Sequence, residues 1–268
     1  MLNKKNWTSE IERVMDSAEN RAPADLLKDL YDIGSAMGED SADALLDDNQ
    51  DLFKFAPILT EAYQRTVVSK EIAEIERISQ MNLDGPVPFT DVAGPPTIVT
   101  YNRVGEMFAA IDFSNCHRLV MVGCGRLPAA VFHVHDRTDV PEIVCLDVLP
   151  EAVSTAGDLL DRLGYSRART ELCDGRRYDY ADTQIVLIAN MVSPKSEVVS
   201  RIADTAAGDV RIVVRDSLSL GRLWSDNVER SLDPRLEVMG RSDGRKHWSL
   251  SRDLYLKLRA PIASKDQS

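Results

Sequence analysis

Residues Leu119–Pro128 read LVMVGCGRLP, an apolar run that leads into a turn with two glycines and a proline. Such a run, bounded by a turn and followed by helical spacing, predicts a buried strand over Leu119–Val122 and a helix over Leu127–His135. Gly123 and Gly125 allow a sharp turn and a close approach to a ligand, and the N-terminus of the helix adds partial positive charge. The stretch therefore predicts a nucleotide site at the end of a strand in an α/β sheet.

Pro128 stands where a dinucleotide-binding fingerprint has its last glycine. Proline suits the first turn of a helix, because its missing N–H is not needed there. A third glycine would bring the helix close enough to the strand for pyrophosphate binding, and its absence disfavours a dinucleotide. The turn, together with an antiparallel end of the sheet, therefore counts against a nicotinamide-dependent oxidoreductase.

Beyond Asn115, apolar runs alternate with segments of helical spacing, which is the pattern of a doubly wound parallel sheet. Further strands are predicted over Ile143–Leu146, Arg169–Leu172, Gln184–Ala189 and Val210–Val214, and further helices over Glu151–Leu163 and Ser196–Ala206. The C-terminal sequences RLEVMGR and HWSLSRDLYLKL flank the turn SDGRK and predict two strands at an antiparallel edge. The fold class is therefore α/β.

The chain before the sheet predicts a small helical domain over residues 1–85, because apolar residues recur there at helical spacing. Residues 86–115 begin with a stretch rich in proline and glycine, which predicts a linker or lid-like loop, followed by a connecting helix over Tyr101–Ile111. Residues 116–260 make up the predicted sheet domain, and the polar tail 261–268 is expected to be disordered.

The composition is that of an ordinary globular protein, with 44% hydrophobic and 28% charged residues among 268. No apolar run approaches the roughly 20 residues of a membrane span, and the N-terminal sequence MLNKKNWTSEIERVMD carries charges where a signal peptide needs an apolar stretch. We therefore expect a cytoplasmic protein without a membrane partner. The net charge of −11 and the scattered basic residues argue against a nucleic-acid partner, favour a small-molecule ligand and leave a homodimer open.

Neither the cysteines nor the histidines predict a metal site. The four cysteines show no C-x-x-C spacing, and Cys124, Cys145 and Cys173 fall in or beside predicted strands, where a thiol acts as a small apolar residue. The HVHD run, His133–Asp136, ends a predicted helix, a place where cationic side chains are favoured without any metal.

Polar residues follow three further strands of the predicted sheet. Asp147 ends the second strand, 22 positions after Gly125, where a carboxylate accepts hydrogen bonds from ribose hydroxyls. Asp174 ends the third strand and can meet an adenine amino group, and Asn190 ends the fourth. Because ligands bind at the carboxyl ends of parallel strands, these residues and the glycine turn predict one ligand site. The alternative is a set of solvated loop residues.

The segments LVMVGCGRLP, IVCLDVLPEAV, CDG and LIANMV, with the antiparallel C-terminal pair, resemble the S-adenosylmethionine-binding fold of class I methyltransferases. Within that group the chain is similar to nicotianamine synthase and the related bacterial opine-metallophore synthases. The similarity lies in the helical N-terminal domain, the GCGRLP turn, TYNRVGEM ahead of the sheet and VVRDSLSLGR near its end, and it covers most of residues 70–258.

This resemblance implies a Rossmann-like class I methyltransferase fold with a small N-terminal helical domain. It implies S-adenosylmethionine as co-substrate and transfer of its 3-amino-3-carboxypropyl group to the amine of an amino-acid acceptor. The products are methylthioadenosine and a nicotianamine-like or opine-metallophore precursor. The cofactor-binding residues are then expected to be Gly123, Gly125, Pro128, Asp147, Asp174 and Asn190.

An amine nucleophile must be unprotonated, so this transfer requires a general base. Glu74 and Glu76 are candidate bases, with a solvated helix face as the alternative. Tyr101 is a candidate for contact with the sulfonium through its hydroxyl or its ring; a place in the core is the alternative, and the resemblance favours the contact. Arg215, assisted by Ser217, is a candidate to bind a substrate carboxylate, or else it pairs with a surface acid.

Other functions stay open on the sequence. The same cofactor can serve methyl transfer to a small molecule, or its own amino group can attack to close the ring of azetidine-2-carboxylate, which calls for a small, closed pocket. A non-catalytic interaction module is the alternative of another class. Damaged motifs would favour such a module, whereas the glycine turn and both aspartates are present.

Overall fold

Seven strands form one sheet in the computed structural model, which describes residues 4–243 and 250–259. The strands are β1 (Arg118–Val122), β2 (Glu142–Asp147), β3 (Ala168–Leu172), β4 (Ile185–Ile188), β5 (Arg211–Ser217), β6 (Leu236–Arg241) and β7 (Ser251–Leu258). Their order across the sheet is β3-β2-β1-β4-β5-β7-β6. The first five strands are parallel, and β7 is antiparallel to both β5 and β6.

The α/β fold predicted from the sequence is confirmed, including the antiparallel edge. The order of the strands reverses between β1 and β4, so the carboxyl ends of these two neighbours flank a crevice in which open α/β sheets bind ligands. The predicted strands and helices of the sheet domain are present with small differences at their ends. Two predictions lie partly or wholly outside the described residues. They are the turn SDGRK, which is described only as far as Asp243, and the disordered tail 261–268.

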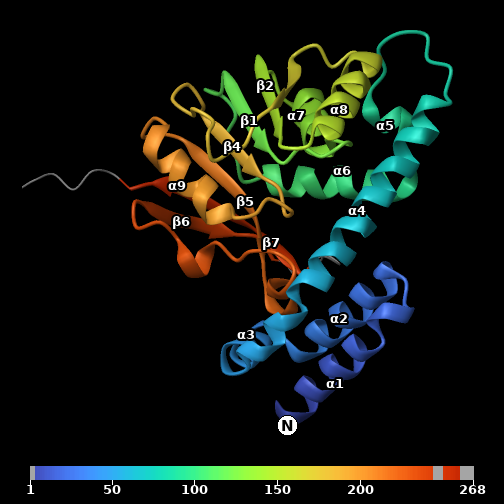
Figure 1. Cartoon of the computed structure of the whole chain (residues 1–268). Coiled ribbons are helices and arrows are strands. Elements are labelled where there is room, and N and C mark those ends of the chain that lie inside the picture. The colour runs from blue at the N-terminus through green and yellow to red at the C-terminus, as the bar shows by residue number, and fades with distance from the viewer. Residues whose placement is uncertain (1–3, 244–249, 260–268) are drawn as a thin grey trace, which may run out of the picture.

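Alternate residues of the strands point to opposite faces of the sheet, and helices cover both faces. Val120, Val144 and Val186 pack in one hydrophobic cluster, on the face covered by α9 (Lys195–Thr205). Their neighbours in sequence pack in a second cluster, on the face covered by α7 (Ala129–Arg137) and α8 (Pro150–Leu163). Figure 1 shows α7 and α8 on one side of the strands and α9 on the other.

The N-terminal part is helical, as predicted. It consists of α1 (Lys4–Asp16), α2 (Pro23–Met37), α3 (Glu39–Asp48) and α4 (Ala56–Ser79), with the 3₁₀ helices η1 (Ala18–Asn20) and η2 (Gln50–Phe55). These helices share a hydrophobic cluster of their own, which also takes in Leu220, Leu223 and Trp224 at and after the 3₁₀ helix η3 (Ser219–Leu223). A further 3₁₀ helix, η4 (Glu229–Ser231), precedes β6. The long helix α4 runs from this bundle to the sheet (Figure 1) and thereby brings helical residues to the ligand edge.

The segment between α4 and the sheet differs from the prediction. It contains α5 (Phe89–Val92) and α6 (Pro95–Phe108), so the connecting helix begins six positions before Tyr101. The expected loop is therefore shorter and is confined to residues near Gly85. The prolines at the start of α6 do not interrupt it, because the first turn of a helix requires no N–H from them. Within the described residues, none of the helices combines the length and the apolar character of a membrane span.

Candidate active site

A cavity of about 800 Å³ lies at the carboxyl ends of the parallel strands. The glycine turn after β1 and the residues that follow β2, β3 and β4 form its floor, and α4 and α6 contribute side chains to its wall. The polar and charged side chains that line it include Tyr63, Glu71, Arg103, Asp147, Asn190 and Arg215. The cavity thus occupies the edge at which the sequence predicts a ligand site.

The turn after β1 requires its two glycines. Gly123 and Gly125 have φ angles of +77° and +67°, a region that disfavours residues with a Cβ. The amide of Gly123 donates to the carbonyl of Leu146 at 2.8 Å, and the amide of Gly125 donates to Oδ2 of Asp147 at 2.9 Å. Asp147 and the turn are therefore joined directly, at the edge where the sequence predicts a ligand site. Pro128 directly precedes α7, which begins at Ala129 and not at Leu127.

Asp174 and Asn190 both line the cavity. The Asp174 carboxylate forms an ion pair with Arg176, 2.6 Å between the closest atoms, and the hydrogen bonds from Arg176 hold the pKa of Asp174 below its usual range. Nδ2 of Asn190 donates to the hydroxyl of Tyr63 on α4 at 2.9 Å. The strand ends and the helical domain therefore meet directly at this edge.

Glu71 of α4 reaches over the glycine turn. Its Oε1 lies 2.8 Å from the position that a Cβ on Gly125 would take, and its Oε2 accepts a hydrogen bond of 3.4 Å from the amide of Arg126. Burial raises the pKa of Glu71 to about 7, and the charge of Asp147 acts in the same direction, against the contact with Arg126. Glu71 is thus a carboxylate inside the cavity that gains and loses a proton near neutral pH.

Glu71 was not among the residues predicted from the sequence. It lies one turn before Glu74 on the same helix, so the helical period of the segment EIAEIERI places the two glutamates on neighbouring parts of one face. That period does not reveal which face of α4 meets the sheet. The contact with the glycine turn, which comes from a distant part of the chain, decides the face.

Two arginines stand close together on the far wall of the cavity. Burial, followed by the positive charge of Arg215, lowers the pKa of Arg103 to about 10. Arg215 donates to Oδ1 of Asp253 at 2.8 Å and to the hydroxyl of Ser251 at 3.0 Å, both on β7. Among the described residues, Arg103 forms no ion pair of this kind. The cavity therefore holds an excess of positive charge where a carboxylate group of a ligand can bind.

The two predicted bases on α4 lie outside the cavity lining. Glu74 is buried, accepts two hydrogen bonds from Arg77 and accepts a third from the amide of Gly94 at 2.6 Å. Burial alone would raise the pKa of Glu74, but these hydrogen bonds hold it below its usual range. Glu76 is exposed. Glu74 therefore fastens the start of α6 to α4, and Glu76 occupies the solvated face that the sequence analysis gave as its alternative.

Because three hydrogen bonds end on one buried carboxylate, we expect Glu74→Ala to lower the free energy of unfolding by about 1–3 kcal/mol. Urea denaturation followed by circular dichroism measures the change. The matched control is Glu76→Ala, an exposed glutamate two positions away, for which we expect a change within about 0.5 kcal/mol. Equal losses in the two variants would contradict the role given to Glu74.

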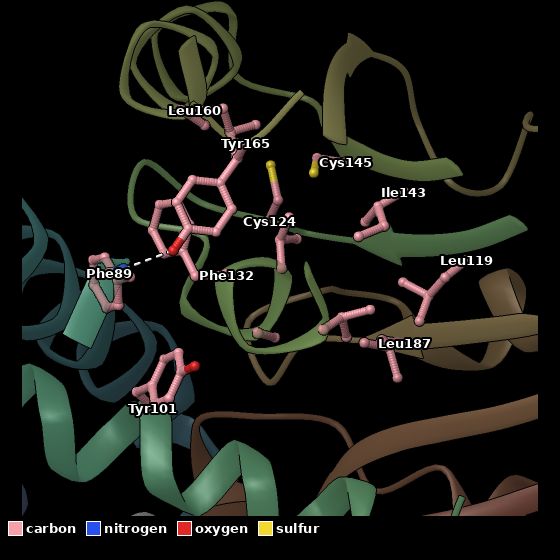
Figure 2. Packing of buried hydrophobic residues seen from close by; sticks show 14 of the residues in the cluster. Phe89, Tyr101, Leu119, Cys124, Phe132, Ile143, Cys145, Leu160, Tyr165 and Leu187 are labelled. Atoms are coloured by element: carbon pink, nitrogen blue, oxygen red, sulfur yellow. Dashed lines mark hydrogen bonds between the residues drawn. The ribbon is translucent and has the colours of Figure 1, made fainter. Parts of the chain in front are cut away.

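Tyr101 also lies outside the cavity lining. Its side chain is 1% exposed and packs against Phe89 and His133, and its hydroxyl donates to Oδ2 of Asp136 at 2.8 Å. Oδ1 of the same carboxylate accepts from Tyr165 at 2.9 Å. Burial, followed by the contact with Asp136, raises the pKa of Tyr101 to about 12. Figure 2 shows this ring within the hydrophobic cluster, in the core position that was the alternative to sulfonium contact.

Ser217 does not face the cavity either. It is 1% exposed, and its hydroxyl donates to the carbonyl of Ser225 at 2.7 Å. It therefore ties the end of β5 to the loop after η3. The HVHD run lies within α7, toward its C-terminal end, and burial lowers the pKa of both His133 and His135. In the described part of the chain, no group of three or more His, Cys, Asp or Glu side chains is arranged to hold a metal ion.

No protein-family model matches the sequence, and no curated protein sequence matches it. Solved structures do match. MtNAS, a nicotianamine synthase, has been solved as a glutamate-to-glutamine variant in complex with S-adenosylmethionine. It superposes with a TM-score of 0.77 at 15% sequence identity, over 94% of this chain and 98% of that one. The chain has the nicotianamine synthase fold. A complex of MtNAS with MTA and tNA gives a TM-score of 0.79 at 15% identity, over 95% and 98% of the two chains.

The likeness to the nicotianamine synthase fold includes the helical N-terminal part as well as the sheet. Mitomycin 7-O-methyltransferase MmcR, by contrast, matches over 60% of this chain and 54% of its own, with a TM-score of 0.50 at 19% identity. The fold predicted from the sequence resemblance, a class I methyltransferase fold with added N-terminal helices, is therefore confirmed.

Proposed function

We propose that the protein transfers the 3-amino-3-carboxypropyl group of S-adenosylmethionine to the amine of an amino-acid acceptor and releases methylthioadenosine. The observation that carries the proposal is the Glu71 carboxylate, which projects from the added helical part onto the glycine turn of the sheet. The match to the nicotianamine synthase fold, solved with S-adenosylmethionine and with MTA, supports the choice of co-substrate.

The residues at the strand ends fit S-adenosylmethionine. Asp147 at the end of β2 stands where ribose hydroxyls can donate to a carboxylate. Val148 and Leu149, which follow Asp147 and line the cavity, are apolar and well exposed, at 59% and 45%. Such side chains gain by covering an adenine ring. Asp174, on the neighbouring strand end, can accept from the adenine amino group.

Glu71 supplies the proton transfer that an amine acceptor requires. The α-amino group of a free amino acid is protonated at neutral pH and must lose its proton before it can attack. In the proposed reaction the amine nitrogen bonds to the methylene carbon beside sulfur, the C–S bond breaks with its electron pair going to sulfur, and the proton goes to Glu71. A carboxylate with a pKa of about 7 is matched to this task, because it is largely ionised above neutral pH and still basic.

The size of the cavity favours a second substrate. A volume of about 800 Å³ lies in the upper part of the range of roughly 300–1,000 Å³ for ligand sites. Ring closure within S-adenosylmethionine needs a smaller, closed space, so transfer to an acceptor is the better fit. Because Arg215 is paired with Asp253, Arg103 is left to bind a substrate carboxylate.

We expect Arg103→Gln to raise the KM for the amino-acid acceptor, or the Kd of S-adenosylmethionine, about tenfold or more, because a charge-assisted hydrogen bond to a carboxylate is lost. Steady-state release of methylthioadenosine and calorimetric titration measure the two constants. Arg65→Gln, an exposed arginine on α4, is the matched control and should leave both constants unchanged. If Arg103→Gln resembles this control, Arg103 binds no substrate carboxylate.

The proposal is tested by incubating the purified protein with S-adenosylmethionine, with and without each amino acid in turn, and identifying the nucleoside product by mass spectrometry. Methylthioadenosine that forms only when an acceptor is present supports the proposal. Release without an acceptor, together with azetidine-2-carboxylate, indicates cyclisation, and S-adenosylhomocysteine indicates methyl transfer. Cofactor binding and turnover both absent would favour an interaction module.

A further inference from the structure

A lysine is buried beside the cavity at the start of α9. Lys195 is 0% exposed, and its Nζ donates to the hydroxyl of Ser225 at 2.7 Å and to the carbonyl of Asp226 at 3.1 Å. Burial lowers the pKa of Lys195 to about 8, and Arg215 acts in the same direction, whereas the charges of Asp216 and Asp226 oppose this shift. Burying an ammonium group costs free energy unless hydrogen-bond partners compensate for the lost water, so the partners of Lys195 indicate its role.

One branch of its hydrogen bonds leads to the cavity. The hydroxyl of Ser225 lies 2.8 Å from the carbonyl of Asn190 and 3.1 Å from its side-chain Oδ1. Nδ2 of Asn190 donates in turn to the hydroxyl of Tyr63 at 2.9 Å. Asn190 and Tyr63 both line the cavity, so a continuous chain of hydrogen bonds joins Lys195 to its wall.

The donors at the two ends of this chain, the Lys195 ammonium and Nδ2 of Asn190, set the direction of its bonds. An ammonium can only donate, so the oxygen of Ser225 accepts, and its single proton turns to Asn190. Two acceptors on Asn190 lie within reach of that proton, the backbone carbonyl at 2.8 Å and Oδ1 at 3.1 Å, and Nδ2 of Asn190 donates to the phenol oxygen. The phenol proton is left to point elsewhere. Among the described residues, no protein atom accepts it, and the charge of Arg103 acts on the same part of the cavity.

We propose that Lys195 is a positioning residue for the cavity. Acting through Ser225 and Asn190, it holds the Tyr63 hydroxyl as a hydrogen-bond donor to a carboxylate of a bound substrate. Which substrate carries that carboxylate, the sulfonium co-substrate or the acceptor, rests on the proposed function. The hydrogen-bond chain itself does not, so the two can fail separately.

The chain is tested first without ligand, by a double-mutant cycle on the free energy of unfolding. Ser225→Ala and Tyr63→Phe are combined, and urea denaturation is measured for the two single variants and the double variant. We expect the double variant to lose less stability than the sum of the single losses, because both changes break the same chain. Additive losses would overturn the proposal whatever reaction the protein catalyses. If Ser225→Ala does not fold, Lys195→Met takes its place in the cycle.

The second arm measures the Kd of S-adenosylmethionine by calorimetry and the KM of the acceptor by methylthioadenosine release. We expect Tyr63→Phe to weaken one of the two about tenfold or more, through loss of a hydrogen bond to a charged group. The constant that changes identifies the substrate that carries the carboxylate. Ser225→Ala should weaken the same constant less, and the double variant should match Tyr63→Phe alone. Unchanged constants in Tyr63→Phe, or multiplied effects in the double variant, would overturn the positioning role.

Thr205→Val is the matched control, because Thr205 ends α9 as Lys195 begins it. Its hydroxyl also donates one hydrogen bond, to the carbonyl of Arg201 at 3.0 Å, and accepts one, from the amide of Tyr180 at 3.2 Å. Combined with Tyr63→Phe, it should give additive losses of stability and leave Kd and KM unchanged. Coupling as large as that of Ser225 would show that the cycle reports general loosening of α9 and would overturn the proposal.

Discussion

Glu71→Gln is expected to lower the rate of methylthioadenosine release about 100- to 10,000-fold, the usual contribution of a general base. The amide keeps the size of the side chain and its contact with Gly125 but cannot take the proton of the acceptor amine. The Kd of S-adenosylmethionine should change little, because the loss concerns proton transfer and not binding. Rapid-quench or steady-state measurement of the nucleoside product, beside calorimetric titration, separates the two effects.

The pH dependence gives an independent check on Glu71. With a pKa of about 7, the carboxylate is protonated and inactive below neutral pH, so kcat/KM should rise as the pH passes through about 7. That step should be missing in Glu71→Gln. Glu61→Gln, the same change at an exposed position of α4, should keep both the rate and the step. A Glu71→Gln variant that turns over at the rate of the unmodified protein would contradict the assignment.

Loss of the buried carboxylate should not unfold the protein. The folded-state pKa of Glu71 lies above its ordinary value, so the folded state favours the neutral form. The stability that this gives is present below pH about 4.5 and is lost as the pH rises through about 7. Above neutral pH, Glu71→Gln should therefore be at least as stable as the unmodified protein, which separates lost activity from lost structure.

Gly125→Ala is expected to weaken binding and to slow turnover. The φ angle of +67° strains any residue with a Cβ, by about 1–2 kcal/mol. The added methyl group would also meet Oε1 of Glu71 at 2.8 Å and displace the carboxylate from its place over the turn. We therefore expect the Kd of S-adenosylmethionine to rise tenfold or more and the rate of product release to fall further than in Glu71→Gln.

Gly208→Ala is the control for this variant. Gly208 lies in the loop before β5, with no atom within 4 Å of an added Cβ, so its substitution should leave binding and turnover unchanged. Normal affinity in Gly125→Ala would show that the turn does not approach the ligand, and it would remove the main argument for where the cofactor binds.

The residues that repeat a regular pattern were predicted from the sequence. Strand ends recur after each apolar run, so Gly123, Asp147, Asp174 and Asn190 fall at one edge of the sheet whatever the details of packing. The antiparallel pair at the C-terminus was predicted from two strand-like sequences on either side of the turn SDGRK. The helical N-terminal part was equally visible in its period.

The residues that depend on contacts between distant segments were not predicted. Glu71 and Glu74 lie one turn apart, and only the packing of α4 on the glycine turn turns Glu71 toward the cavity and Glu74 toward Gly94. Tyr101 was predicted to contact the sulfonium, yet its ring is buried between α6 and α7 in the hydrophobic cluster. The helix boundary at Pro95 was missed because proline breaks most helices but fits their first turn.

In the proposed reaction, the bond broken in S-adenosylmethionine joins sulfur to the aminocarboxypropyl group. The most direct test of this claim uses S-adenosylmethionine isotopically labelled in the methyl group, an amino-acid acceptor and mass spectrometry of both products. We predict that all the label stays in the nucleoside, as labelled methylthioadenosine, while the acceptor gains an unlabelled aminocarboxypropyl group. Label on the acceptor, with unlabelled S-adenosylhomocysteine as the nucleoside, would contradict the claim and establish methyl transfer.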